Sequence, residues 1–191
     1  MIVMGIDPGT ASTGYGVIES FGGRLACLDY GCIRTGSNMS SSRRLETIYA
    51  AVSRLISSYS PEVIAVEELF FNRNAKTALK VGESRGVVIL AAVRHSIRVA
   101  EYTPLQIKQA ITGYGRASKS QIQRMIKLLL NLESVPSPDD TADALACAIC
   151  HIHSDSRLAN LDRALGADRR EGCSGDGREL TSMLKSGENQ G

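Results

Sequence analysis

Tryptophan is absent from the sequence, and phenylalanine occurs only three times in its 191 residues. No run approaches the roughly 20 apolar residues that are needed to cross a bilayer, so we expect no membrane partner. The opening segment, MIVMGIDPGT, lacks the basic start of a secretory signal, so we expect a cytoplasmic protein. The formal net charge of only +2 lacks the strong excess of basic residues that would indicate a nucleic-acid binder by composition alone.

The composition that is present is ordinary for a globular protein, with 43% hydrophobic and 22% charged residues. The length suits one α/β domain with a substantial core and a short appendage. Five cysteines are an odd number, and a reducing compartment would keep them as thiols.

Hydrophobic periodicity predicts ten elements in the order βββαβαβααα. We expect strands over 2–7, 13–20, 24–33, 63–67 and 97–102, and helices over 41–57, 75–95, 104–112, 119–130 and 141–153. The first three strands are joined by tight turns and should form an antiparallel meander. The pattern predicts an α/β fold, a mixed sheet covered by helices, over residues 1–154. Gly, Ser and charges dominate from residue 166 on, so 155–191 is predicted to be a flexible, disordered tail.

Four acidic residues stand where strands end or a helix begins. Asp7 closes the first strand, Glu67 closes the fourth, and Asp140 and Asp143 lie one turn apart at the start of the last helix. Each has an ordinary structural explanation, as a turn residue, an exposed strand end or a helix cap. Their order, with elements that can bring all four to one sheet edge, favours a shared site.

Carboxylates that converge repel one another, and a divalent cation relieves that repulsion. Mg²⁺ prefers oxygen ligands and keeps positions for phosphate oxygens. We therefore expect two Mg²⁺ ions, with Mn²⁺ as an acceptable substitute, held by Asp7, Glu67, Asp140 and Asp143. In phosphodiester hydrolysis, one ion would activate the attacking water and the other would stabilise the leaving 3′ oxygen.

Three separated motifs carry a resemblance to a known family. They are GIDPGTxxTGYGVI from residue 5, AVEELFFxxN from residue 65 and DDTADALA from residue 139. Together with GCIRT at 31–35 and ALKVGESRGV at 78–87, they resemble the RuvC family of Holliday junction resolvases, and the match extends over about residues 1–153.

The resemblance implies an RNase H-like fold, here a five-stranded mixed sheet with helices on both faces, and a magnesium site made from the same four acids. It also implies a bacterial homodimer that cuts four-way junction DNA by paired symmetric nicks, leaves 5′-phosphates, and acts in recombination and repair with a branch-migration complex of the RuvA and RuvB type. A dimer contact would use the helix around Gly82 and Gly86.

Several residues are candidates for DNA contact. Phe70 follows the fourth strand in a polar loop, and an aromatic there can stack on an unpaired base; in proteins similar to this one the matching aromatic has that role. The segment Arg116–Lys119 places charge and small residues at a helix start, an arrangement suited to phosphate. The resemblance also singles out Lys108 and Lys119 as contacts near the site. A solvated surface is the ordinary alternative for these charges.

Three other interpretations remain to be weighed. The sequence Cys147-Ala-Ile-Cys150-His151 spells a haem-attachment pattern, but it continues an apolar helix, so we expect buried thiols and no haem. The Asp-x-Gly-Thr start also opens the phosphate loop of ATP-binding actin/hexokinase-type domains, although such proteins need two domains and a second phosphate motif. A third possibility is a junction-binding module without catalysis, against which the intact acids argue.

Overall fold

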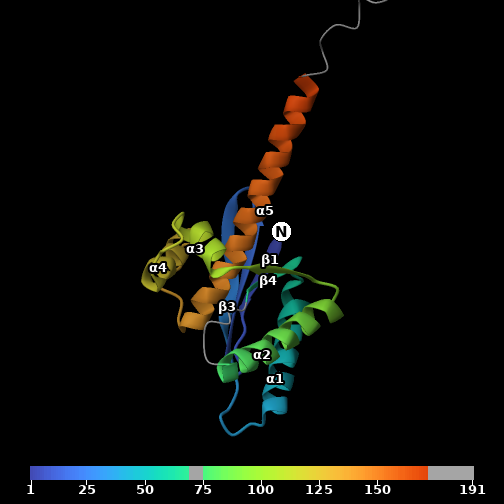
Figure 1. Ribbon diagram of the computed structural model, residues 1–191, viewed down its shortest axis with the longest axis vertical. Coiled ribbons are helices and arrows are strands. Elements are labelled where there is room, and N and C mark those ends of the chain that lie inside the picture. The colour runs from blue at the N-terminus through green and yellow to red at the C-terminus, as the bar shows by residue number, and fades with distance from the viewer. Residues whose placement is uncertain (69–74, 172–191) are drawn as a thin grey trace, which may run out of the picture. The chain divides into compact units, whose positions relative to one another are not determined.

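The structure, a computed structural model, describes residues 1–68 and 75–171, and for 75–77 and 159–171 it describes the backbone alone. Figure 1 shows the arrangement of its strands and helices. Their bounds are β1 Ile2–Asp7, β2 Ser12–Phe21, β3 Arg24–Arg34, α1 Ser41–Tyr59, β4 Val63–Glu67, α2 Ala75–Arg94, β5 Arg98–Tyr102, α3 Pro104–Thr112, α4 Lys119–Leu129 and α5 Asp139–Glu171.

The five strands form one mixed sheet in the order β3-β2-β1-β4-β5. β1, β2 and β3 make the predicted antiparallel meander, whereas β1, β4 and β5 run parallel. Because β1 and β4 are parallel neighbours, their carboxyl ends reach the same sheet edge. Ile6 pairs with Val66, so Asp7 and Glu67 end adjacent strands side by side.

The sheet separates two hydrophobic cores, because successive side chains of a strand point to opposite faces. Val3, Ile18 and Ala65 lie in the core that α3, α4 and α5 cover. Met4 and Ile64 lie in the core beneath α1 and α2. Figure 1 shows α1 beside α2 and α3 beside α4. The prediction of an α/β sheet with helices on both faces is confirmed.

The helices begin where the polar side chains of the sequence can cap them. Ser40 accepts from the backbone N–H of the third residue of α1, and Thr103 and Ser118 form capping boxes at the starts of α3 and α4. α3 also has Pro104 in its first turn and ends at Gly113, whose φ of 71° is the left-handed conformation that glycine adopts readily. These caps fix the two helices that border the site.

α5 lies directly on the sheet, backbone against backbone. Its first turns are rich in small residues, and Ala142, Ala144, Ala146 and Ala148 are almost fully buried. A Cβ atom on Gly5 would lie 1.9 Å from the backbone oxygen of Ala144, and one on Gly14 would lie 2.0 Å from that of Asp140. Real Cβ atoms essentially never approach within 3.0 Å, so both positions require glycine. The close contact places the first turn of α5 at the edge where β1 and β4 end.

Side-chain hydrogen bonds fasten α5 at two further points. Thr141 Oγ1 donates to the backbone oxygen of Gly31 over 3.2 Å, which ties the first turn to β3. Farther along, His151 Nδ1 and the Tyr102 hydroxyl are 2.6 Å apart, which joins the helix to the end of β5. The helix is therefore anchored to both edge strands of the sheet, β3 and β5.

The thiols of Cys147 and Cys150 are buried on this core helix, at 2% and 1% exposure, as the sequence predicts. Burial raises the pKa of Cys147 well above its usual value and that of Cys150 to about 11. Both side chains are therefore protonated packing groups at neutral pH.

The last helix is longer than its sequence pattern predicts. It continues to Glu171 rather than ending near His153, because Ala, Leu and Arg, all good helix formers, dominate residues 157–165. The chain divides into two units, Met1–Ser154 and Asp155–Gly191. Flexibility of 155–191 stays a prediction, and 172–191 lie outside the described residues.

No helix in the described part of the chain is long and apolar enough to cross a membrane.

We predict that Gly14→Ala lowers the free energy of unfolding by about 3 kcal/mol, because the new methyl group meets the backbone of α5 rather than a movable side chain. Gly36→Ala is the matched control, since its Cβ would come too close only to the end of the exposed Asn38 side chain and would make an ordinary contact with Met39. Urea unfolding of the two variants checks the difference. Equal stabilities would contradict direct packing of α5 on β2.

Candidate active site

The four predicted acids come together at one edge of the sheet. Val3 and Ala65 face α5, and the alternation of side chains places Asp7 and Glu67 on that same face at the ends of their strands. Asp140 lies in the first turn of α5, whose backbone contacts β2 at Gly14. Strand ends and a helix start thus contribute carboxylates to one region.

Asp7 stands at the electrostatic centre of this group. Its pKa is raised from 3.8 to about 7, chiefly by burial, and three neighbouring carboxylates raise it further, in the order Asp143, Asp140 and Glu67. The charge of Lys119 opposes them. Because Coulomb interactions weaken with distance, their combined effect at Asp7 indicates that the four acids converge.

Two more carboxyl groups of the set are destabilised as anions. Burial, followed by the charge of Asp143, raises the pKa of Glu67, while Lys108 and Lys119 lower it. Burial also raises the pKa of Asp143, against the hydrogen bond and charge of Lys119. The site therefore holds more negative charge than its two lysines neutralise, and a cation would be stabilised there.

Lys119 bridges two acids at the start of α5. Its Nζ lies 3.1 Å from a carboxylate oxygen of Asp139 and 3.1 Å from one of Asp143. Asp139 also accepts a hydrogen bond from Gln123 of α4 over 2.9 Å. Asp139 is not among the predicted site residues. Asp139 and Asp140 are neighbours at the start of one helix, so the sequence does not show which of them points into the site.

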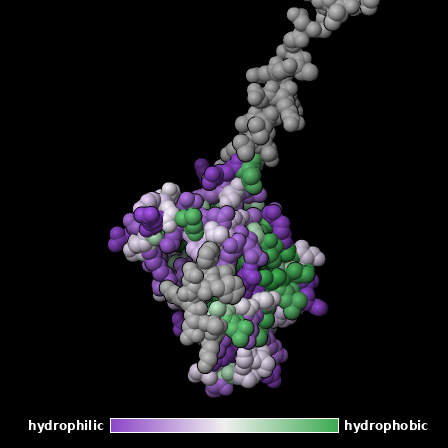
Figure 2. Space-filling view, in the orientation of Figure 1, coloured by the Kyte–Doolittle hydropathy of each residue, from purple (hydrophilic) through white to green (hydrophobic). Residues whose placement is uncertain are grey.

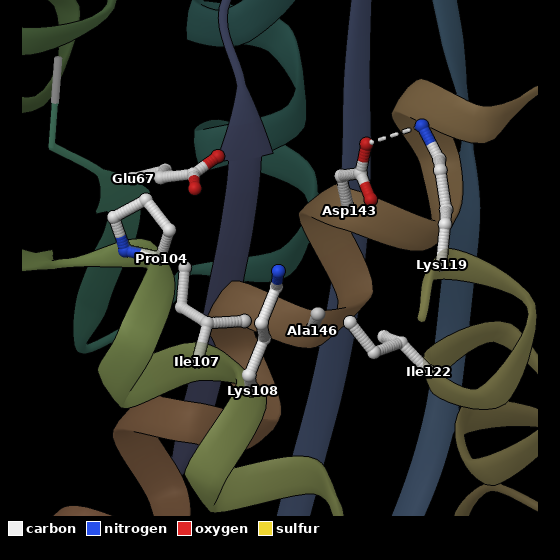
Figure 3. A pocket seen from close by; sticks show the side chains of 8 residues that line it. All are labelled: Glu67, Pro104, Ile107, Lys108, Lys119, Ile122, Asp143 and Ala146. Atoms are coloured by element: carbon white, nitrogen blue, oxygen red, sulfur yellow. Dashed lines mark hydrogen bonds and ion pairs between the residues drawn. The ribbon is translucent and has the colours of Figure 1, made fainter. Parts of the chain in front are cut away.

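A cavity of about 390 Å³ opens beside these groups. Figure 3 shows Glu67 on one side and the Asp143–Lys119 pair on the other, with Lys108 pointing from α3 into the space between them. The remaining lining is mostly apolar and comes from Pro104, Ile107, Ile122 and Ala146. The cavity thus combines carboxylates, two ammonium groups and a hydrophobic floor.

Asp7 and Asp140 do not line this cavity. Asp140 instead accepts a hydrogen bond from the hydroxyl of Ser12, whose Oγ is also 2.7 Å from Cys32 Sγ. Sequence reasoning did not single out Ser12, since no local pattern relates it to a residue so far along the chain. Glu68, which sequence reasoning left out of the site, is exposed and lies just beyond β4.

The donor chemistry of the four acids fits a hard divalent cation such as Mg²⁺, which prefers carboxylate oxygens. In the described residues, no three acidic, histidine or cysteine side chains are already grouped with the geometry of a metal site. Asp143 uses Oδ2 to bind Lys119, and Asp140 uses Oδ2 to bind Ser12. Each carboxylate also has a second oxygen, so binding a cation requires rearrangement of side chains and not of the fold.

The family model for the crossover junction endodeoxyribonuclease RuvC matches residues 3–151. The chain belongs to the RuvC family. It is 58% identical over 154 residues to the crossover junction endodeoxyribonuclease RuvC of Alkaliphilus oremlandii, covering 81% of this chain and 94% of that protein. The match spans all three sequence motifs, so the predicted family is confirmed, and with it an endonuclease.

Two solved RuvC structures are similar to this chain. The structure of Thermus thermophilus RuvC matches with a TM-score of 0.76 and 36% identity, over 83% of this chain and 97% of that one. The T. thermophilus RuvC in complex with Holliday junction substrate matches with the same TM-score and 34% identity, over 82% of this chain and 96% of that one. The RNase H-like fold predicted from the motifs is confirmed.

The predicted DNA contacts have different outcomes. Lys108 and Lys119 both line the cavity. Arg116 is exposed in the loop between α3 and α4 and does not line it. Phe70 lies outside the described residues. The structure thus places two of the four in the cavity that Glu67 and Asp143 also line.

We predict that Asp7→Asn stabilises the metal-free protein at alkaline pH. The folded pKa of about 7 lies above the ordinary 3.8, so the wild type loses stability as pH rises from about 4 through 7. The amide carries no such penalty, and its advantage in urea unfolding with a chelator should grow by about 2 kcal/mol between pH 5 and pH 8. Glu19→Gln, on an exposed part of β2, should follow the wild type. An advantage independent of pH would contradict the convergence of charge at Asp7.

Proposed function

We propose that this RuvC-family endonuclease resolves four-way (Holliday) junctions by paired symmetric nicks during recombination and repair, and leaves ligatable 5′-phosphates. The observation that carries the proposal is the convergence of four carboxylates around Asp7, beside a cavity that holds two lysines. The solved complex of a family member with Holliday junction substrate supports the choice of DNA. ATP binding is supported only by the short Asp-x-Gly-Thr segment, and no feature of the described residues adds to it.

Asp7, Glu67, Asp140 and Asp143 are proposed to hold two Mg²⁺ ions, for which Mn²⁺ can substitute. When bound, such ions supply a more acidic water and neutralise charge on the leaving oxygen. A bound cation would stabilise the Asp7 carboxylate most, because this anion is partly buried and three other acids repel it.

The lysines of the cavity are proposed to bind the DNA backbone. Lys108 and Lys119 approach from α3 and α4 and present ammonium groups at the mouth of the acidic site. A phosphate that enters can take over the contact that Lys119 makes with Asp143, since ammonium groups bind phosphate as point charges. Each lysine thereby draws the scissile phosphate towards the carboxylates without acting as a metal ligand.

Arg116 and Phe70 are proposed to contact DNA farther from the scissile bond. Arg116 lies three residues before the start of α4, where an exposed guanidinium and the helix N-terminus can share a phosphate. Phe70 follows β4 closely in sequence and is proposed to stack on an unpaired base at the junction centre. Both roles rest on the family resemblance and on residue type.

We further propose a homodimer that places two sites on one junction, in the bacterial cytoplasm and with a branch-migration complex of the RuvA and RuvB type. α2 carries the surface that supports it. Leu79, Leu90 and Val93 are 68%, 52% and 63% exposed, and Figure 2 shows hydrophobic surface over this helix. A second copy would bury these side chains, and an isologous contact fixes the spacing between the two sites.

The first experiment is cleavage of a labelled synthetic four-way junction, with a linear duplex of the same sequence as the substrate control. We predict Mg²⁺-dependent paired nicks in the junction, and a loss of at least about 100-fold in rate for Asp7→Asn and Glu67→Gln, with junction binding retained. Glu68→Gln is the matched control, since this neighbouring carboxylate is exposed beyond β4, and it should cut like the wild type. Binding without any cutting by the wild type would instead identify a junction-binding module.

For the dimer, we predict that Leu90→Glu combined with Val93→Glu converts the protein to monomers, because buried unpaired carboxylates oppose an apolar contact. Leu128→Glu on α4 is the control, since that leucine is even more exposed, at 71%, but lies on a different helix. Sedimentation velocity measures the mass of each variant. A dimer that survives the double change would place the interface elsewhere.

A further inference from the structure

Ser12 makes a connection that the four-carboxylate scheme does not include. It is the first residue of β2, and its hydroxyl donates a hydrogen bond to Oδ2 of Asp140, 128 positions away in the sequence. The hydroxyl oxygen of Ser12 also lies 2.7 Å from Sγ of Cys32 on the neighbouring strand β3. Three side chains from β3, β2 and α5 therefore form one chain of hydrogen bonds that ends on a proposed metal ligand.

The direction of these hydrogen bonds follows from the chemistry of the three groups. A carboxylate only accepts, so the single proton of the Ser12 hydroxyl points to Asp140. The contact between Ser12 and Cys32 then requires the thiol to donate. The order is thus Cys32 to Ser12 to Asp140, and successive bonds of one direction strengthen one another.

The arrangement is fixed by the backbone and not by flexible side chains. Ser12 pairs with Arg34 in the β2–β3 ladder, and two residues later Gly14 contacts the backbone of Asp140 directly. Ser12 therefore has a defined distance to the first turn of α5. Its short side chain has one rotatable bond before the hydroxyl oxygen, so the donor position is well determined.

The hydrogen bond from Ser12 is not what holds α5 in place. The first turn is already anchored by the contact at Gly14 and by the hydrogen bond from Thr141 to the backbone of Gly31. Since Asp140 is only half-buried, its side chain has room for other rotamers. The effect of Ser12 therefore falls on the orientation of the carboxylate, which leaves Oδ1 as the oxygen not engaged by this bond.

We propose that Ser12 is a positioning residue that orients the Asp140 carboxylate for cation binding, and that Cys32 holds the Ser12 hydroxyl in the required direction. The inference rests on the proposed function, because it takes Asp140 to be a metal ligand. Outer groups that hydrogen-bond to a ligating carboxylate reduce the freedom it must lose when a cation binds. Loss of the hydroxyl should accordingly weaken cation binding more than it weakens the fold.

The test compares Ser12→Thr with Ser12→Val, two side chains of the same shape that differ by a hydroxyl in place of a methyl group. Isothermal titration calorimetry of the full chain with MgCl₂ alone measures cation affinity without any cleavage. We expect Ser12→Thr to remain within about twofold of the wild type, and Ser12→Val and Ser12→Ala to bind about tenfold more weakly. Cys32→Ala should lie between them. Mg²⁺ dependence of junction cleavage should shift to higher concentration by the same factors.

Thr141→Val is the structural control, because it removes an anchor of the same helix turn without touching a carboxylate. It should lower the melting temperature in chelator and leave Mg²⁺ affinity unchanged. Equal Mg²⁺ affinities for Ser12→Thr and Ser12→Val would overturn the positioning role. The proposed function would still stand in that case if the wild type cuts junctions. A wild type that neither binds Mg²⁺ nor cuts junctions would instead overturn the proposed function itself.

Discussion

Direct contact between the backbone of α5 and the glycines of β1 and β2 is the constraint on which the site depends. At Gly5 and Gly14, even one methyl group would overlap a carbonyl oxygen of the helix. The backbone of Ala144 and Ala148 lies against Gly5, and that of Asp140 and Thr141 lies against Gly14, so helix and strands approach more closely than side chains of ordinary size allow. Carboxylates are short, and those on a helix can join those on strand ends only when the backbones lie this close. Fold and site therefore rely on the same few small residues.

The proximity that builds the site also works against folding. Four acids share a partly buried region, and the pKa of Asp7 rises to about 7 as a result. Two lysines offset part of this charge, and the hydrophobic cores on both faces of the sheet supply the stability that tolerates the rest. Such local instability is typical of sites that are organised for a ligand the chain itself does not contain. The chain belongs to the RuvC family of endonucleases, so this local instability lies in a protein that acts on a ligand.

Much of this could be predicted from the sequence, because the deciding signals are local. Short apolar runs that end in Asp7 and Glu67 identify strand ends, and the order of the elements indicates a mixed sheet that can bring the two acids to one edge. What escaped prediction depends on tertiary contact. The Lys119–Asp139 ion pair and the link from Ser12 to Asp140 join residues whose separation carries no periodic signal. The extension of α5 to Glu171 is hidden for another reason: the composition becomes polar after residue 154, whereas the helix propensity of its Ala, Leu and Arg residues stays high.

The order of the elements along the chain has a consequence for synthesis. β1 precedes every other element and α5 follows them all, so Asp7 leaves the ribosome long before Asp140 and Asp143. Strands that have already emerged can pair, as domains tend to fold from the N-terminal side. The nascent polypeptide nevertheless lacks half of the proposed carboxylates until its final helix is made. A product truncated before α5 therefore lacks Asp140 and Asp143, and under the proposed function its site is incomplete.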